Sequence, residues 1–143
     1  MEILLVEDGL LDARITIHAL RRSGIRHRLT LVRTVQEAID FLARRGVFAR
    51  APQPDLLLLD LTLPDGNGVE ILDEMRVLHA DRSSRTPVVI LSASDDDQTQ
   101  RQCLELGVDD FIGKPVDEDK FLRVVRDHEH LMRFSDQASM VGV

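Results

Sequence analysis

The chain has 143 residues, of which 43% are hydrophobic, and its formal net charge at pH 7 is −7. This length suits one compact domain with a hydrophobic core of its own. The acidic balance argues against an autonomous nucleic-acid binder, and no apolar run approaches the roughly 20 residues of a membrane-spanning helix.

The N-terminal residues lack the features of an export signal, because neither a basic segment nor a cleavage site precedes the first strand-like run. A single cysteine, Cys103, permits no intrachain disulfide and is expected to be buried as a packing residue. We therefore expect a cytoplasmic protein that has neither nucleic acid nor a membrane as its partner.

Short apolar runs alternate with longer segments of helical periodicity along the chain. The first run, Ile3–Val6, is continuously apolar and is followed by a segment with apolar residues at helical spacing. The second run, Arg28–Val32, alternates between polar and apolar residues, which suggests a strand at the edge of a sheet. Thr34 and Glu37 then form a capping box that predicts the start of the second helix.

The second half of the chain continues the same alternation. The third run, Leu56–Leu61, is apolar apart from Asp60, and the fourth, Val88–Leu91, is continuously apolar, as expected of parallel strands covered on both faces. Gly107 is predicted to end the fourth helix, and the fifth run, Asp110–Ile112, precedes the fifth helix. Five β-α units in strict alternation predict a doubly wound α/β sheet with helices on both faces.

The chain continues beyond the five β-α units. We predict one domain over residues 1–134, with a lengthened last helix, and a flexible tail over residues 135–143. Leu131, Met132 and Phe134 have no obvious place in the five-unit core. They either fold back on the domain or contribute to an oligomer interface.

Chemically active side chains follow the predicted strands. Glu7 and Asp8 follow the first strand, Asp60 stands at the end of the third, and Ser92 and Lys114 follow the fourth and fifth. The carboxyl ends of parallel strands meet at one edge of the sheet, where ligands bind. Two carboxylates about 4 Å apart repel by roughly 4 kcal/mol at an effective dielectric constant near 20. We therefore expect a hard divalent cation such as Mg²⁺, beside which one carboxylate acts as a nucleophile toward phosphorus.

The same motifs resemble those of the receiver domain of two-component response regulators. They are Glu7-Asp8, Asp60 in LLLLDLTLPDGNG, Ser92-Ala93 in VVILSAS, and Lys114-Pro115 in DDFIGKP. The resemblance covers roughly residues 2–127 and implies a flavodoxin-like, five-stranded parallel sheet of order 2-1-3-4-5. It also implies that Asp60 accepts a phosphoryl group from a sensor histidine kinase. The domain would then be a phosphorelay switch and not a multiple-turnover enzyme.

The resemblance also implies a metal site. Asp8, Asp60 and the backbone carbonyl of Thr62 would hold Mg²⁺ directly, with Mn²⁺ as an alternative, and Glu7 would assist through a water molecule. Glutamate at position 7 replaces the commoner aspartate but keeps the carboxylate.

Further positions correspond to the catalytic and switch residues of the family. Lys114 and Ser92 would contact phosphoryl oxygens, and Ser92 would also be a switch residue together with Phe111. Serine replaces the commoner threonine at position 92 and keeps the hydroxyl group. The peptide bond between Lys114 and Pro115 would be cis, a geometry that is largely reserved for bonds preceding proline.

The long connections and the extra C-terminal segment resemble stand-alone regulators that pair with phytochrome-type histidine kinases. We predict that the kinase docks over the first helix, where Leu10 and Leu11 follow Asp8, and over the loop after the fifth strand. We also predict a homodimer on the face of the fourth helix, fifth strand and fifth helix. In this hypothesis Leu131, Met132 and Phe134 of the C-terminal extension enlarge that face.

Three other functions fit parts of the pattern. An aspartyl phosphatase or phosphotransferase would share Mg²⁺, Asp60 and Lys114, but it needs a second acid shortly after the nucleophile, where position 62 is threonine. A pseudo-receiver that serves only protein contacts would not need the complete set of acids, hydroxyl and lysine. A flavodoxin-type electron carrier shares the architecture, but the acidic sheet edge and the lack of Trp and Tyr suit FMN poorly.

Overall fold

The computed structural model describes residues 1–78, 85–93 and 97–134. Its central feature is a five-stranded sheet of order β2-β1-β3-β6-β7, in which all neighbouring strands are parallel. The strands are β1 (Glu2–Val6), β2 (Arg28–Val32), β3 (Leu56–Asp60), β6 (Val88–Ser92) and β7 (Asp110–Gly113). Counted along the chain, these strands have the order 2-1-3-4-5, so the predicted doubly wound fold is confirmed.

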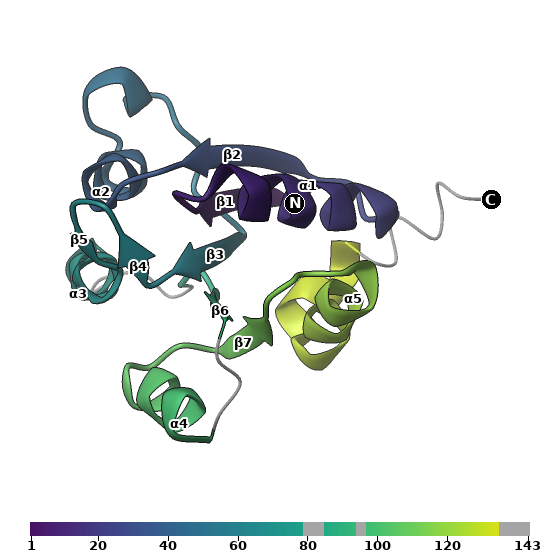
Figure 1. Cartoon of the computed structure of the whole chain (residues 1–143). Helices are drawn as coiled ribbons and strands as arrows, with labels where there is room; N and C mark the ends of the chain where they lie inside the picture. Colours follow the sequence, from purple (N-terminus) through teal and green to yellow (C-terminus); the bar gives the residue numbers. More distant parts are fainter. Residues whose placement is uncertain (79–84, 94–96, 135–143) are drawn as a thin grey trace.

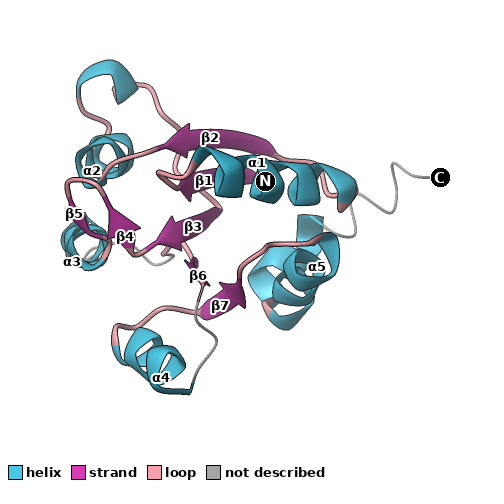
Figure 2. Cartoon of the chain, in the orientation of Figure 1, coloured by secondary structure: helices cyan, strands magenta, loops and turns pink. Residues whose placement is uncertain are grey.

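Helices cover both faces of this sheet (Figure 1, Figure 2). They are α1 (Leu10–Arg22), α2 (Val35–Ala43), α3 (Val69–Leu78), α4 (Asp97–Glu105) and α5 (Glu118–Asp127). α1 and α5 pack on one face, and α2, α3 and α4 pack on the other. In the part of the chain that the structure describes, no helix is both long enough and apolar enough to cross a bilayer.

The leucine-rich strands explain the two layers of core. Because successive side chains of a strand point to opposite faces, a continuously apolar strand contributes to both layers. Leu56 and Leu58 of β3 pack beneath α1 and α5, whereas Leu57 and Leu59 pack beneath α2, α3 and α4. The alternating strand β2 lies at the edge of the sheet, as its sequence predicts.

Local capping interactions define several helix ends. The Thr34 hydroxyl oxygen accepts a hydrogen bond of 3.0 Å from the backbone N–H of Glu37 at the start of α2. The Asp117 carboxylate accepts one of 2.8 Å from the N–H of Lys120 at the start of α5. Gly107 has a φ of 83°, a left-handed conformation that favours glycine, and follows the end of α4 as predicted.

A two-stranded hairpin, which the sequence analysis did not predict, follows β3. It consists of β4 (Thr62–Leu63) and β5 (Gly66–Asn67), and Asp65 lies at its turn. The Asp65 carboxylate accepts hydrogen bonds of 2.7 and 3.1 Å from the N–H groups of Val35 and Gln36. These bonds, led by the one from Val35, lower the pKa of Asp65. The hairpin is thereby attached to the N-terminus of α2.

The C-terminal segment differs from the prediction. α5 ends before His128, whose backbone is extended with φ −121° and ψ 104°, and residues 129–134 form a separate short helical segment. Leu131 and Phe134 pack into the core beneath α1 and α5. The proposal that these two side chains enlarge an interface is therefore wrong, because they complete the core of their own domain. The predicted tail, residues 135–143, lies outside the described residues.

Candidate functional site

Lys114 lies just beyond the carboxyl end of β7 and joins carboxylates from three other parts of the chain. Its Nζ atom lies 2.6 Å from Glu7 Oε1, 3.0 Å from Asp60 Oδ2 and 3.1 Å from Asp12 Oδ2. We call these four residues the Lys114 cluster. Strands β1, β3 and β7 bring Glu7, Asp60 and Lys114 to the same edge of the sheet, and α1 supplies Asp12.

The Lys114 cluster has more negative than positive charge. The Glu7 side chain is 2% exposed, and burial together with the nearby Asp60 carboxylate raises the pKa of Glu7 despite the hydrogen bond from Lys114. Burial alone would lower the pKa of Lys114, but its hydrogen bonds to Glu7 and Asp60 outweigh burial and raise that pKa. Lys114 therefore remains a cation at neutral pH, and a single ammonium faces three carboxyl groups.

Asp60 and Asp8 have different partners. At the end of β3, Asp60 Oδ1 accepts a hydrogen bond of 3.0 Å from the N–H of Thr62, while its Oδ2 faces Lys114. Asp8 is paired with Arg33, whose Nη2 atom lies 3.5 Å from Asp8 Oδ1 and donates to the Asp8 carbonyl oxygen at 3.1 Å. The side chains of Asp8 and Arg33 are 47% and 48% exposed. Water can therefore take the place of Arg33 as the partner of Asp8 at low cost.

The residues at this edge have the chemistry of a divalent-cation site, although they do not form a closed cage. Within residues 1–78, 85–93 and 97–134, no group of three or more His, Cys, Asp or Glu side chains is arranged to hold a metal ion. Asp8 and Asp60 nevertheless carry carboxylate oxygens, the type of ligand that hard cations such as Mg²⁺ prefer. The excess negative charge favours such a cation, and the solvent-exposed Asp8 is free to leave Arg33 for it.

Ser92 lies on β6, which neighbours the Asp60 strand β3, and Phe111 lies on β7, the strand beyond β6. Ser92 ends β6, and its carbonyl oxygen accepts a hydrogen bond of 2.7 Å from the N–H of Lys114. The peptide bond between Lys114 and Pro115 is cis. Phe111 of β7 is half-buried and packs against the core beneath α2, α3 and α4. A backbone hydrogen bond thus links Lys114 to Ser92, and Phe111 lies three residues before Lys114 in the same segment.

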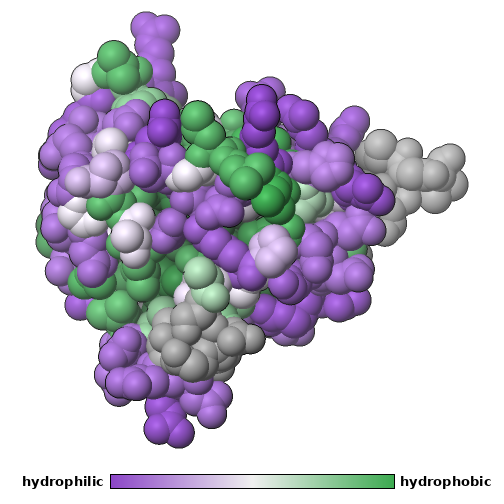
Figure 3. Space-filling view, viewed as in Figure 1, coloured by the Kyte–Doolittle hydropathy of each residue, from purple (hydrophilic) through white to green (hydrophobic). Residues whose placement is uncertain are grey.

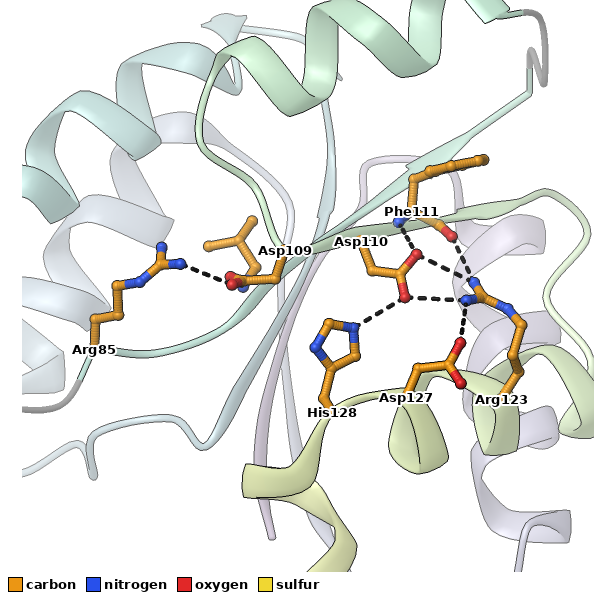
Figure 4. A network of polar contacts seen from close by, with 8 residues as sticks. Arg85, Asp109, Asp110, Phe111, Arg123, Asp127 and His128 are labelled. Atoms are coloured by element: carbon orange, nitrogen blue, oxygen red, sulfur yellow. Dashed lines mark hydrogen bonds and ion pairs between the residues drawn. The ribbon is translucent and has the colours of Figure 1, made fainter.

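A second polar cluster lies beside Phe111, where β7 meets α5 (Figure 4). The Asp110 carboxylate lies 3.0 Å from Arg123 Nη1 and 2.9 Å from His128 Nε2. Arg123 also lies 3.1 Å from Asp127 and donates a hydrogen bond of 2.9 Å to the Phe111 carbonyl oxygen. Burial by itself would raise the pKa of Asp110, but the hydrogen bonds from Arg123 and His128 lower it. We call Asp110, Arg123, Asp127 and His128 the Asp110 cluster.

Exposed apolar side chains and a groove lie next to the Lys114 cluster. Leu10 and Leu11, in the first turn of α1, are 58% and 71% exposed. Figure 3 shows hydrophobic residues at the surface in the region where Figure 1 places α1. A groove of about 490 Å³ runs between α1 and the start of α5, and Arg14, Ala19 and Val116 are among its lining residues.

Three features of this region were not predicted from the sequence. Arg33 directly follows β2, so the rule applied to the other strand ends could have found it. Asp12 lies in the first turn of α1, directly after the strand end that carries Glu7, and this position was a usable signal for a further acid near the site. The pairing of Asp110 with Arg123 depends on how α5 packs on β7, for which the sequence contains no comparable signal.

The fold and the Lys114 cluster define a class of protein. It is a doubly wound α/β domain with aspartate and lysine at the carboxyl edge of its sheet, an arrangement suited to reversible phosphoryl chemistry. Comparison with known families agrees with this class, because the family described as the response regulator receiver domain matches residues 3–126. The chain belongs to the receiver-domain family. Receiver domains are phosphorylated in two-component signalling, and their partners are sensor histidine kinases.

Individual relatives have a similar size and fold. The chain is 37% identical over 112 residues to response regulator Rcp1 of Synechocystis sp., a match that covers 78% of this chain and 75% of Rcp1. A structure of Rcp1 in its Mn(2+)-bound form has a TM-score of 0.70, with 35% identity and coverages of 86% and 88%. The bacteriophytochrome response regulator RtBRR has a TM-score of 0.77, with 38% identity and coverages of 88% and 76%.

The phosphorylated cyanobacterial phytochrome response regulator RcpA has a TM-score of 0.70, with 35% identity and coverages of 88% and 89%. The chain spans 44% and 47% of the length of two further curated relatives. The receiver domain is thus what this chain shares with proteins of different lengths.

Proposed function

We propose that this domain accepts a phosphoryl group on Asp60 from a sensor histidine kinase and changes its surface in response. The observation that carries this proposal is the position of Asp60. Its Oδ2 atom lies 3.0 Å from the Lys114 ammonium, at the end of a buried strand, and its side chain is 18% exposed. A nucleophilic carboxylate needs access for the donor on one side and a cation that stabilises phosphoryl oxygens on the other.

The proposed transfer has a simple electron balance. A carboxylate oxygen of Asp60 forms a bond to phosphorus, and the bond between phosphorus and the imidazole nitrogen of the donor phosphohistidine breaks. The electron pair of that bond stays on the imidazole nitrogen. Lys114 remains protonated and donates a hydrogen bond to one phosphoryl oxygen, and Ser92 donates its hydroxyl hydrogen bond to another. The chemistry of the domain is limited to its own phosphorylation and slow dephosphorylation.

We propose Mg²⁺ as the cofactor, with Mn²⁺ as an alternative that the Mn(2+)-bound form of Rcp1 supports. Asp8, Asp60 and the Thr62 carbonyl would hold the cation, and Glu7 would contribute through a water molecule. When bound, the cation neutralises charge on the transferring phosphoryl group. The excess of acids in the Lys114 cluster supports this assignment.

The proposed response involves Ser92, Phe111 and the segment around Pro115. When Ser92 turns toward the phosphoryl group, the space beside β6 changes, and the half-buried Phe111 on β7 can adjust its packing. This couples Asp60 to the face formed by α4, β7 and α5. A homodimer on this face stays a prediction. Because Leu131 and Phe134 belong to the core, such a dimer has to use other side chains.

The oligomeric state can be measured directly. Analytical ultracentrifugation of the full chain, with and without phosphodonor, should detect association at high micromolar concentration. A chain that stays monomeric under both conditions would contradict the dimer.

The proposed kinase surface is α1 with the loop after β7. Leu10 and Leu11 are exposed in the first turn of α1, just beyond Asp8, so we expect a partner that delivers a phosphoryl group to Asp60 to cover them. Similarity to RtBRR and RcpA supports a phytochrome-type histidine kinase as this partner. We expect Leu11→Glu to slow transfer from the kinase about tenfold and to leave labelling by a small phosphodonor unchanged.

The matched control for the kinase surface is Leu104→Glu. Leu104 is 60% exposed on α4 and therefore loses no buried packing when it is replaced. Leu104→Glu should leave transfer from the kinase and labelling by the small phosphodonor unchanged. If Leu11→Glu slows labelling by the small phosphodonor as much as transfer from the kinase, the site or the fold is damaged and α1 is not a docking surface.

Intact mass and Phos-tag electrophoresis after incubation with Mg²⁺ and acetyl phosphate test the proposed function. The wild-type chain should gain one phosphoryl group, and Asp60→Asn should gain none, because the amide is not a nucleophile toward phosphorus. Asp110→Asn removes an acid of the second cluster and should still be labelled. Full labelling of Asp60→Asn would refute the assignment.

A further inference from the structure

Asp12 is the member of the Lys114 cluster that the proposed phosphoryl transfer does not use. It lies in the first turn of α1, and its Oδ2 atom lies 3.1 Å from Lys114 Nζ. An ammonium group has three N–H donors. Glu7, Asp60 and Asp12 each accept from this ammonium. The donors of Lys114 are therefore all engaged before a phosphoryl group arrives.

A phosphoryl oxygen on Asp60 can gain a new hydrogen bond from Lys114 only when an existing contact gives way. The Glu7 side chain is 2% exposed, so its release would leave a buried carboxylate without its cation. The Asp12 side chain is 46% exposed, and water can replace Lys114 there at low cost. The contact with Asp12 is thus the one that yields.

Repulsion between Asp12 and a phosphoryl group on Asp60 also opposes phosphorylation. A phosphoryl group has a charge of about −1.5 to −2 at neutral pH. Asp12 shares the Lys114 ammonium with Asp60, so the two carboxylates lie on either side of one small cation. Adding a phosphoryl group to Asp60 increases the negative charge that faces Asp12. Both competition for Lys114 and repulsion by Asp12 disfavour the phosphorylated state.

We propose that Asp12 is a positioning residue that restrains phosphorylation of this domain, because it competes with the phosphoryl group for Lys114. The inference rests on the proposed function of Asp60 and adds a residue that sets how readily that site is occupied. In the unphosphorylated domain Asp12 holds the ammonium toward α1. In the phosphorylated domain Lys114 turns to the phosphoryl oxygens, and Asp12 is left to solvent.

The test uses beryllofluoride, BeF₃⁻, which binds an aspartate carboxylate in place of a phosphoryl group. The full chain is titrated at saturating Mg²⁺, and backbone amide NMR signals report the concentration at half-saturation. Asp12→Asn should lower this concentration about two- to fivefold, the range expected for one partly exposed charge pair. Asp119→Asn is the matched control, because it removes the same charge from the first turn of another helix, α5, and it should have no effect.

A double-mutant cycle identifies Lys114 as the mediator. In the Lys114→Ala background, the effect of Asp12→Asn should become smaller than in the wild-type background. An equal effect in both backgrounds would overturn the competition mechanism. Weaker binding of BeF₃⁻ to Asp12→Asn would also overturn it, because Asp12 would then position Lys114 for the phosphoryl group.

Labelling of the same samples by acetyl phosphate separates this inference from the proposed function. If the wild-type chain is not labelled at Asp60, the proposed function fails. If the wild-type chain is labelled and Asp12→Asn behaves like Asp119→Asn, only the role of Asp12 fails.

Discussion

The Lys114 cluster and the Asp110 cluster both lie at strand β7, and both combine acids with cations, yet their charge balance differs. In the Lys114 cluster three carboxyl groups share one ammonium. In the Asp110 cluster two carboxylates face Arg123 and His128. Accordingly, the pKa of Glu7 is raised and the pKa of Asp110 is lowered, although desolvation by itself would raise the pKa of both. The Lys114 cluster contains repulsion between carboxylates that a further cation can relieve. In the Asp110 cluster the two carboxylates have two partners between them, and the cluster fastens α5 to the sheet.

The largest effect is expected from Asp110→Ala. This substitution removes the partner of Arg123 and His128 at a site where the Asp110 side chain is 14% exposed. We expect the free energy of unfolding to fall by about 2 kcal/mol, measured by urea denaturation at pH 7. Asp127→Ala is the matched control, because it removes only the partly exposed contact with Arg123 and should cost about 0.5 kcal/mol. Equal losses in the two variants would contradict the structural role of Asp110.

Neutralising an acid of the Lys114 cluster should change the free energy of unfolding in the opposite direction. Asp60→Asn removes one negative charge beside the buried Glu7, while an amide oxygen can still accept from the N–H of Thr62. We expect the free energy of unfolding to rise by about 1 kcal/mol in metal-free buffer with a chelator. The measurement is again urea denaturation. A loss of stability comparable to that of Asp110→Ala would mean that the two clusters do not differ in charge balance.

A smaller effect should appear in the pH dependence of stability. The folded-state pKa of Asp110 is lowered, so its contribution is present above the ordinary pKa of aspartate, about 3.9, and is lost as the pH falls through the lowered value. The stability difference between the wild-type chain and Asp110→Asn should therefore shrink below about pH 4, by at most about 1.4 kcal/mol per pH unit. Urea denaturation at several acidic pH values measures this difference. A difference that stays constant would contradict the assigned shift.

The strands and the meeting of Glu7, Asp60 and Lys114 were predictable, because parallel strands bring their carboxyl ends to one edge. The partners of these side chains were less predictable. Whether Arg33 pairs with Asp8 or with another acid depends on distances between elements, which periodicity does not encode. The sequence also left open whether Leu131 folds back or joins an interface. In the structure Leu131 lies in the core. The helix is interrupted at His128, whose extended backbone redirects the chain so that the following helical segment packs on the domain.

The most direct test of the contrast between the two clusters is the thermal shift caused by Mg²⁺. Melting temperatures are measured with chelator and with saturating Mg²⁺ for the wild-type chain, Asp8→Ala and Asp110→Asn. The wild-type chain and Asp110→Asn should both gain about 5 °C, because the cation binds the Lys114 side of β7 and not the Asp110 cluster. Asp8→Ala should gain little. If Asp8→Ala gains as much as the wild-type chain, or if the wild-type chain gains nothing, the assignment of the cation to this edge of the sheet is contradicted.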